Sequence, residues 1–313
     1  MKISLLAFLR YGCTNVSSRQ GSKSCCKTML RESNPVSFWT GIDCNKKLAF
    51  RHMKPHQLGG NKSYDGGRSN TTVMFINGLL SRMDGTKCNA LQRYCYNNDV
   101  SFLSFDYRGH GQSSGHFIDC TMHDWVADAS DMLDYIGQDS NVILIGSSLG
   151  AWISLVLAMQ RPDEITAVIG IGSAIDFTSD TYNTKLTDQQ RKMWEDNPVQ
   201  TSSTSNVIEI SSPYLDNAYP FTRELYQSGN DYLICQDNHL SKIARRELTC
   251  PVRFLHGDED DVIPYTKIYD AADALQSKHS GTDIAIKLIK GGDHRLSNAD
   301  DISSLLDTLS EFL

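Results

Sequence analysis

A serine stands at the centre of a pentapeptide bounded by glycines, Gly146-Ser147-Ser148-Leu149-Gly150. This segment fits the pattern G-x-S-x-G, in which a nucleophilic serine occupies a sharp turn between a strand and a helix. Residues two before and two after the nucleophile would collide in such a turn if they carried bulky side chains. Only Ser148 has a glycine two residues away on both sides, so we predict that Ser148 and not Ser147 is the nucleophile.

A serine hydroxyl is a weak nucleophile until a base removes its proton and an acid orients that base. In chains with this turn, the acid and then the histidine follow the serine. The segment LIKGGDHRL (288–296) places His294 in a glycine-rich loop after an apolar run. Of the nine histidines, only His294 lies in a turn after a strand beyond the acidic segment FLHGDEDDVIP (254–264), so we expect it to be the base.

The acid is harder to choose, because the acidic segment contains consecutive candidates. They follow an apolar run, which would place them at the same edge of a parallel sheet as the serine and the histidine. A run of acids is also typical of a solvated turn. The residues alone leave Asp258, Glu259, Asp260 and Asp261 open.

The oxygen that becomes negative during attack on an acyl group needs two hydrogen-bond donors. The backbone amide of Leu149, directly after the nucleophile, is one expected donor. The second should come from the loop after the first core strand, which begins Asn77-Gly78-Leu79-Leu80. We expect Gly78 to permit an unusual backbone that turns the amide of Leu79 inward; the alternative is an ordinary strand-ending turn.

Apolar runs and helix-like patterns alternate along most of the chain. Strands are expected as a hairpin at 37–53 and at 71–78, 100–107, 141–147, 165–174, 251–257 and 282–290. Helices are expected at 86–98, 121–138, from the elbow to about Arg161, at 265–278 and at about 298–313. The almost continuously apolar runs indicate strands covered by helices on both faces. The alternation predicts a doubly wound, mostly parallel α/β sheet with right-handed crossovers.

Residues 175–248 interrupt this alternation. They combine a helix-like segment, TDQQRKMWED (187–196), with a turn-rich middle. We expect them to form a cap inserted over the ends of the strands, within one domain that spans residues 32–313.

The charges are unevenly distributed over the 313 residues. The first 31 residues carry Lys and Arg but no Asp or Glu, although the whole chain has a net charge of −7. An acid-poor leader with Arg and Ser is typical of a mitochondrial transit peptide, so we expect residues 1–31 to direct the protein to the mitochondrial matrix. A secretory signal and a disordered tail are the alternatives. The acidic remainder argues against nucleic acid as a partner.

The nine cysteines are scattered, without metal-ligand spacing or a CxxC pair. This pattern favours free thiols in a reducing compartment, and no metal site is expected. No run of about 18 apolar residues occurs, so no stable membrane span is expected.

Several motifs occur together in register from about residue 71 to the end of the chain. They are INGLLSRMDGTK, FDYRGHGQSSG, FIDCTMHDWVAD, GSSLGAW, FTRELYQSGNDYLI, CPVRFLHGDEDDVIP and GGDHRL. Together they resemble the α/β-hydrolase branch that contains the mitochondrial palmitoyl-protein thioesterase, which also acts as mycophenolic acid acyl-glucuronide esterase. The resemblance implies an α/β-hydrolase fold and a serine hydrolase that needs neither metal nor organic cofactor.

By position, the resemblance implies Ser148 as nucleophile and His294 as base. The family acid lies four residues after the histidine of H-G-x-x-D, which implies Asp260, with Asp261 in reserve. The sequence departs from the family at Asn77, Cys120 and Ala151, where other residues are common. None of these departures removes a reactive group.

The resemblance implies acyl esters or S-acylated proteins as substrates. In or near the cap, Trp152, Trp194 and Phe221 are expected to contact the acyl group, although large apolar residues commonly pack in a core. Further apolar candidates are Phe177, Met193, Ile208, Ile210, Tyr214 and Leu215, and the arginines that could meet an anionic group are Arg82, Arg108, Arg223 and Arg295. A monoacylglycerol or lysophospholipid lipase, or a ligand-binding protein without turnover, are the alternative functions.

Overall fold

The computed structural model describes residues 35–40, 46–54, 70–196, 206–213, 218–236, 241–243 and 246–313. The leader expected at 1–31 and the cap residues Tyr214 and Leu215 lie outside these ranges. Within them, no helix combines the length and the apolar character that crossing a membrane requires.

In the described residues, eight strands form one sheet in the order β1-β2-β4-β3-β5-β6-β9-β10. Their bounds are β1 Ser37–Trp39, β2 Leu48–Met53, β3 Thr71–Ile76, β4 Ser101–Phe105, β5 Asn141–Ser147, β6 Ile165–Ile171, β9 Val252–Gly257 and β10 Ile284–Ile289. β2 pairs antiparallel with both β1 and β4, and the remaining neighbours pair parallel. The predicted hairpin and the mostly parallel sheet are therefore confirmed.

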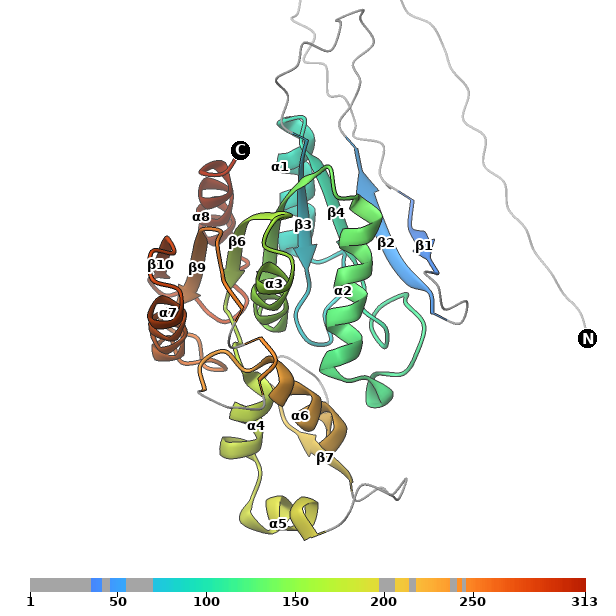
Figure 1. Ribbon diagram of the computed structural model, residues 1–313, viewed down its shortest axis with the longest axis vertical. Coiled ribbons are helices and arrows are strands. Elements are labelled where there is room, and N and C mark those ends of the chain that lie inside the picture. Colours follow the sequence, from blue (N-terminus) through green and yellow to red (C-terminus); the bar gives the residue numbers. More distant parts are fainter. Residues whose placement is uncertain are drawn as a thin grey trace, which may run out of the picture. The chain divides into compact units, whose positions relative to one another are not determined.

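Helices cover both faces of this sheet (Figure 1). They are α1 Thr86–Asn97, α2 Met122–Ile136, α3 Leu149–Gln160, α7 Thr266–Lys278 and α8 Ala299–Ser310. Buried residues of α2, α3 and α7 form one apolar cluster, and those of α1 and α8 form another. Along β3, Met74 and Ile76 join the first cluster, whereas Val73 and Phe75 join the second. This two-sided burial explains why the strands are apolar at successive positions.

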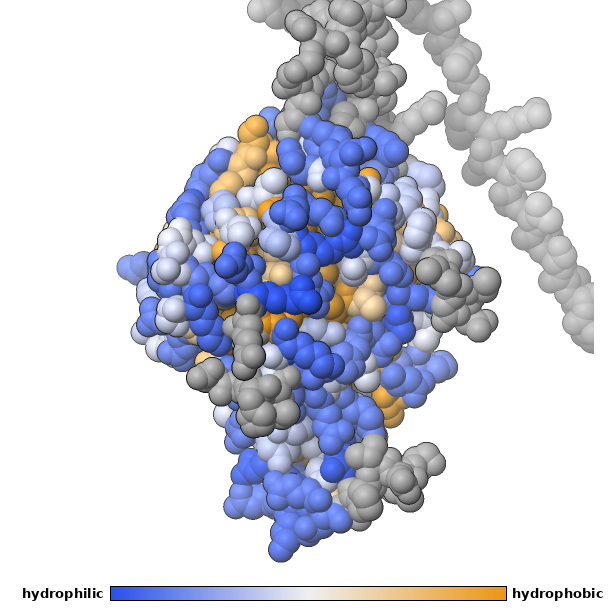
Figure 2. Space-filling view, viewed as in Figure 1, coloured by the Kyte–Doolittle hydropathy of each residue, from blue (hydrophilic) through white to orange (hydrophobic). Residues whose placement is uncertain are grey.

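The chain between β6 and β9, where a cap is predicted, forms a group of elements outside the main sheet, called the cap below. Its described elements are α4 Phe177–Lys185, α5 Asp188–Asp196, β7 Val207–Ile210, β8 Tyr219–Thr222, α6 Arg223–Gly229 and the short 3-10 helix η3 Asn230–Tyr232. β7 and β8 pair antiparallel in a separate sheet. The surface over α5 is hydrophilic in the view of Figure 2, which fits a helix with Trp194 as its buried residue.

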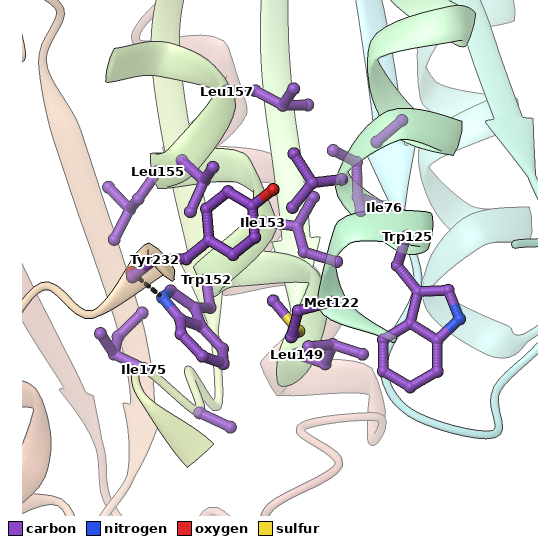
Figure 3. Close-up of a cluster of buried hydrophobic side chains, with 14 of the residues drawn as sticks. Ile76, Met122, Trp125, Leu149, Trp152, Ile153, Leu155, Leu157, Ile175 and Tyr232 are labelled. Atoms are coloured by element: carbon purple, nitrogen blue, oxygen red, sulfur yellow. Dashed lines mark hydrogen bonds between the residues drawn. The ribbon is translucent and has the colours of Figure 1, made fainter. Parts of the chain in front are cut away.

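The end of the cap is fixed to the rest of the chain through its backbone. The indole Nε1 of Trp152, on α3, donates a hydrogen bond to the carbonyl oxygen of Tyr232 at 2.9 Å (Figure 3). The carboxylate of Asp176, between β6 and α4, accepts hydrogen bonds from the amides of Ile234 and Cys235, both at 2.8 Å. One side chain of α3 and one at the start of the cap thus hold the segment 232–235 near the end of the cap.

Candidate active site

Ser148 lies at the point where β5 ends and α3 begins. Its backbone has φ 53° and ψ −117°, a conformation that residues other than glycine rarely adopt. The amide of Ser148 donates to the carbonyl of Ile171 at 2.8 Å, and its carbonyl accepts from the amides of Ala151 at 3.0 Å and Ala174 at 3.2 Å. These bonds to α3, to the end of β6 and to the start of the cap maintain a strained turn of the kind that carries nucleophiles.

The two glycines around this turn are required for space. A Cβ on Gly146 would lie 2.2 Å from the carbonyl oxygen of Gly150, and a Cβ on Gly150 would lie 2.1 Å from that of Ile76. Neither glycine has a positive φ. Both positions therefore require glycine for the steric reason expected from the sequence, and Ser148 as the nucleophile remains a prediction.

Gly78 is also needed for space, and this corrects the expected reason for the glycine. Its φ is not positive; the left-handed residue of the loop is Leu80, with φ 54°. A Cβ on Gly78 would lie 3.2 Å from both the Cβ of Ser148 and the carbonyl oxygen of Ser147. The loop therefore lies close to the serine, and a side chain at Gly78 would require a shift of a few tenths of an ångström.

Three side chains from widely separated segments meet at the carboxyl ends of the strands. The Oγ of Ser148 lies 3.2 Å from Nε2 of His294, and Nδ1 of His294 lies 2.8 Å from Oδ2 of Asp260. They follow β5, β10 and β9, respectively, so the parallel sheet brings them to one edge. Both distances allow hydrogen bonds.

Asp260 differs from its acidic neighbours in its orientation. Asp258, Glu259 and Asp261 are exposed, whereas the side chain of Asp260 is fully buried. Burial alone would raise the pKa of Asp260, but hydrogen bonds from His256 and His294 and from the backbone outweigh it and hold that pKa well below its usual range. Asp260 is therefore a carboxylate at neutral pH.

The loop that carries His294 is fixed on several sides. Gly172, with φ 52°, lies beneath it, where a Cβ would be 2.7 Å from the carbonyl oxygen of His294. The carboxylate of Asp293 accepts from the amides of Arg295 at 3.0 Å and Leu296 at 2.9 Å. Lys87, on α1, donates to the carbonyl of Arg295, and burial lowers the pKa of this lysine to about 8. The imidazole is thus held by its surroundings as well as by Asp260.

Residues after β4 hold the loop next to Ser148, and the sequence reasoning missed them. Asn77 donates from Nδ2 to the carbonyl of Phe105 at 2.8 Å, and the hydroxyl of Tyr107 donates to the carbonyl of Asn77 at 3.2 Å. Asp106 accepts from the amide of Met83 at 2.7 Å. The available signal was the pair of polar residues in FDY, directly after an apolar run.

The three residues expected to contact the acyl group lie in packed interiors, which corrects that expectation. Trp152 and Phe221 have no exposed surface, and Trp194 is 2% exposed. Figure 3 shows Trp152 among apolar side chains, with its indole bonded to the backbone of Tyr232. Trp194 packs against Phe221 and Tyr226, with ring centroids 5.8 and 6.2 Å apart. These side chains join the cap to itself and to α3.

Arg108 is also committed elsewhere. Its guanidinium donates to Asp124 at 2.6 Å and to Asp128 at 2.7 Å, so its charge is already paired within the protein. Arg82 is 65% exposed and pairs with Asp84. Within the described ranges, no cluster of three or more His, Cys, Asp or Glu side chains could hold a metal ion.

The fold and this geometry define a serine hydrolase of the α/β-hydrolase fold. Residues 67–301 match the family model Hydrolase_4, described as serine aminopeptidase S33, and the chain therefore belongs to this α/β-hydrolase family.

Individual relatives cover nearly the whole chain. The mitochondrial palmitoyl-protein thioesterase ABHD10 of Mus musculus is 30% identical over 91% of this chain and 89% of its own length. The protein of the same name from Homo sapiens is 29% identical over 90% of this chain and 81% of its own length.

Solved structures agree with the fold. The alpha/beta hydrolase domain-containing protein 10 from mouse has a TM-score of 0.71 and 27% identity, and the match covers 88% of this chain and 97% of that chain. A putative hydrolase from Agrobacterium vitis S4 has the same TM-score and identity and covers 88% of this chain and 98% of that chain.

Proposed function

We propose that the protein is a serine esterase and thioesterase that removes acyl groups from S-acylated proteins and from acyl esters, including acyl glucuronides. The observation that carries the proposal is the continuous contact from Ser148 through His294 to Asp260, at 3.2 and 2.8 Å. The chemistry proceeds through an acyl-enzyme and uses groups of the protein alone.

Asp260 determines which nitrogen of His294 is the base. A carboxylate only accepts hydrogen bonds, so Nδ1 of His294 carries a hydrogen and Nε2 presents a lone pair to Ser148. As Oγ of Ser148 attacks the acyl carbon, Nε2 takes the hydroxyl proton, and the carboxylate stabilises the imidazolium that forms. His294 then returns the proton to the leaving thiolate or alkoxide.

Backbone amides stabilise the negative oxygen of the tetrahedral intermediate. Leu149 is the first residue of α3, so its amide has no acceptor within the helix. The amide of Leu79 is the second proposed donor, because its loop closely approaches Ser148 through Gly78. In the second half of the reaction, His294 activates a water molecule that releases the acid and regenerates Ser148.

The names of the relatives support both the substrate and the location. ABHD10 is named as a palmitoyl-protein thioesterase and as mitochondrial. We therefore propose thioesters as substrates of this protein and the mitochondrial matrix as its location, with residues 1–31 as the transit peptide.

The test combines active-site labelling with turnover. Wild type should react with a fluorophosphonate and hydrolyse a palmitoyl-thioester peptide and an acyl glucuronide, and Ser148→Ala should lose both properties. Ser147→Ala, which changes the adjacent hydroxyl, is the matched control and should retain them. Absence of labelling in folded wild type would overturn the serine mechanism. Labelling with turnover of a monoacylglycerol alone would overturn the proposed substrates and favour a lipase.

A further inference from the structure

A second histidine contacts the carboxylate of Asp260 from inside the protein. His256 lies in β9, four residues before Asp260, and its side chain is completely buried. Its Nε2 lies 2.9 Å from the carbonyl oxygen of Ile263 and 3.2 Å from Oδ2 of Asp260. The reaction proposed above gives this imidazole no step.

The carbonyl of Ile263 determines the tautomer of His256. A carbonyl oxygen only accepts hydrogen bonds, so Nε2 of His256 must carry a hydrogen, which it shares between Ile263 and Asp260. Its other nitrogen, Nδ1, is buried and has no hydrogen-bond partner among the residues that the structure describes. An unpaired buried polar atom costs stability, and an apolar residue of similar size would avoid that cost. The benefit of a histidine here must therefore come from Nε2.

The donors around Asp260 leave its carboxylate one orientation. Oδ1 accepts from the amides of Val262 at 2.9 Å and Ile263 at 2.8 Å. Oδ2 accepts from His294 at 2.8 Å and lies 3.2 Å from His256. Rotation of the carboxylate would break bonds to both histidines at once.

We propose that His256 is a positioning residue that holds Oδ2 of Asp260 toward His294 and limits how strongly that oxygen attracts the proton of His294. This inference rests on the proposed hydrolase function. The second role follows from electrostatics. The N–H of His256 presents its positive end to the oxygen that stabilises the imidazolium of His294, so it opposes that charge. Removing the donor both loosens the carboxylate and increases the proton affinity of His294.

Three substitutions separate this role from packing. His256→Leu removes the donor and keeps the site apolar. His256→Gln retains a donor, because its amide nitrogen reaches about as far as Nε2. His256→Asn has the same amide on a shorter side chain, and its nitrogen ends near the position of Nδ1.

We expect His256→Leu and His256→Asn to change kcat and the pH profile, and we expect His256→Gln to remain close to wild type in both. With a palmitoyl-thioester peptide as substrate, His256→Leu and His256→Asn should each lower kcat roughly tenfold to hundredfold, the size expected for losing one charge-assisted hydrogen bond. The KM of each variant should stay within about twofold of wild type. The acidic limb of kcat/KM should move up by about half a pH unit. The charged chain neighbours of His294, Asp293 and Arg295, and Lys87, which donates to the carbonyl of Arg295, are unchanged in all variants.

Two readouts guard against ambiguous outcomes. Thermal unfolding identifies variants that do not fold, and where His256→Leu fails, the comparison of Gln with Asn decides. The low-field proton resonance of the His294 Nδ1–H reports its bond to Asp260 without turnover, so it tests the inference even if no ester is cleaved and the proposed function falls. The role of His256 would be overturned if His256→Leu and His256→Asn left both the resonance and the pH profile unshifted. It would also be overturned if His256→Gln and His256→Asn lowered kcat equally.

Discussion

The carbonyl oxygen of Ile76 lies 2.1 Å from the position that a Cβ would occupy on Gly150. This contact joins the last residue of β3 to the first turn of α3, directly behind the nucleophile elbow. The carbonyl of Ile76 and the Cα of Gly150 both belong to the backbone, so neither can move aside as a flexible side chain can.

Gly150→Ala should therefore destabilise the protein strongly. We expect a loss of at least about 2–3 kcal/mol in the free energy of unfolding, because the added methyl group forces α3 away from the sheet. Gly85→Ala is the control, since its Cβ would have its nearest neighbour at 3.7 Å. Urea unfolding of both variants measures the difference, and equal stabilities would contradict the steric argument.

Gly78→Ala should affect catalysis more than stability. Its Cβ would lie 3.2 Å from the Cβ of Ser148, a distance that a shift of a few tenths of an ångström relieves. That shift displaces the loop of Leu79 from the acyl oxygen, so we expect kcat to fall about tenfold or more while the melting temperature changes little. Steady-state kinetics and thermal unfolding on one preparation test this, and an unchanged kcat would count against an oxyanion role for the loop.

Tyr107→Phe removes the hydroxyl that donates to the carbonyl of Asn77. The hydroxyl is buried, so its loss should cost about 1 kcal/mol of stability and leave the Asn77 carbonyl without this partner. Because the loop then loosens beside Ser148, we expect kcat to fall several-fold with KM unchanged. Tyr269→Phe, on the exposed face of α7, is the matched control and should match wild type in both measurements.

Asp176→Asn should change how stability depends on pH. Burial raises the pKa of Asp176 to about 6, although two amides favour its charged form. Between pH 4 and 6 the folded protein retains a proton on Asp176 that the unfolded chain has released. The contribution of Asp176 to the free energy of unfolding therefore falls as pH rises from 4 to 6 and stays constant above pH 6. A shift of this size corresponds to about 2–3 kcal/mol.

Other groups act in different directions, so the comparison must be between wild type and the variant. Burial lowers the pKa values of His52 and His110 to about 4, and these histidines increase stability as pH rises through the same window. The depressed pKa of Asp260 adds stability that is lost only as pH falls below about 4. Urea unfolding at several pH values should show the difference between wild type and Asp176→Asn changing from pH 4 to 6 and constant above; a constant difference throughout would refute the assignment.

Local patterns predicted the elements well, because each helix and strand depends on its own periodicity. The helix predicted at 265–278 is observed at Thr266–Lys278, and the strand predicted at 251–257 is observed at Val252–Gly257. The choice of Ser148 over Ser147 also followed from local sterics. These features need only neighbouring residues to be specified.

Contacts between distant segments were beyond local patterns. The four acids at 258–261 look alike to local patterns, and only the resemblance favoured Asp260; the folded loop shows that this side chain turns inward. Trp152 was expected to contact the substrate, whereas its indole donates to the carbonyl of Tyr232, 80 residues away, a contact that no local pattern indicates. The role of Tyr107 in holding Asn77 likewise depends on how two parallel strands end side by side.

The end of the cap, residues 232–235, is held through its main-chain atoms. Trp152 binds the carbonyl of Tyr232, and Asp176 binds the amides of Ile234 and Cys235. Any amino acid other than proline supplies such groups, so these hydrogen bonds do not depend on side-chain identity, whereas the buried side chains of Tyr232, Leu233 and Ile234 add apolar packing that does. The groups of the proposed chemistry lie after β5, β9 and β10, outside the cap. Substitutions elsewhere in the cap therefore leave both the groups of the proposed reaction and the hydrogen bonds that hold the end of the cap unchanged.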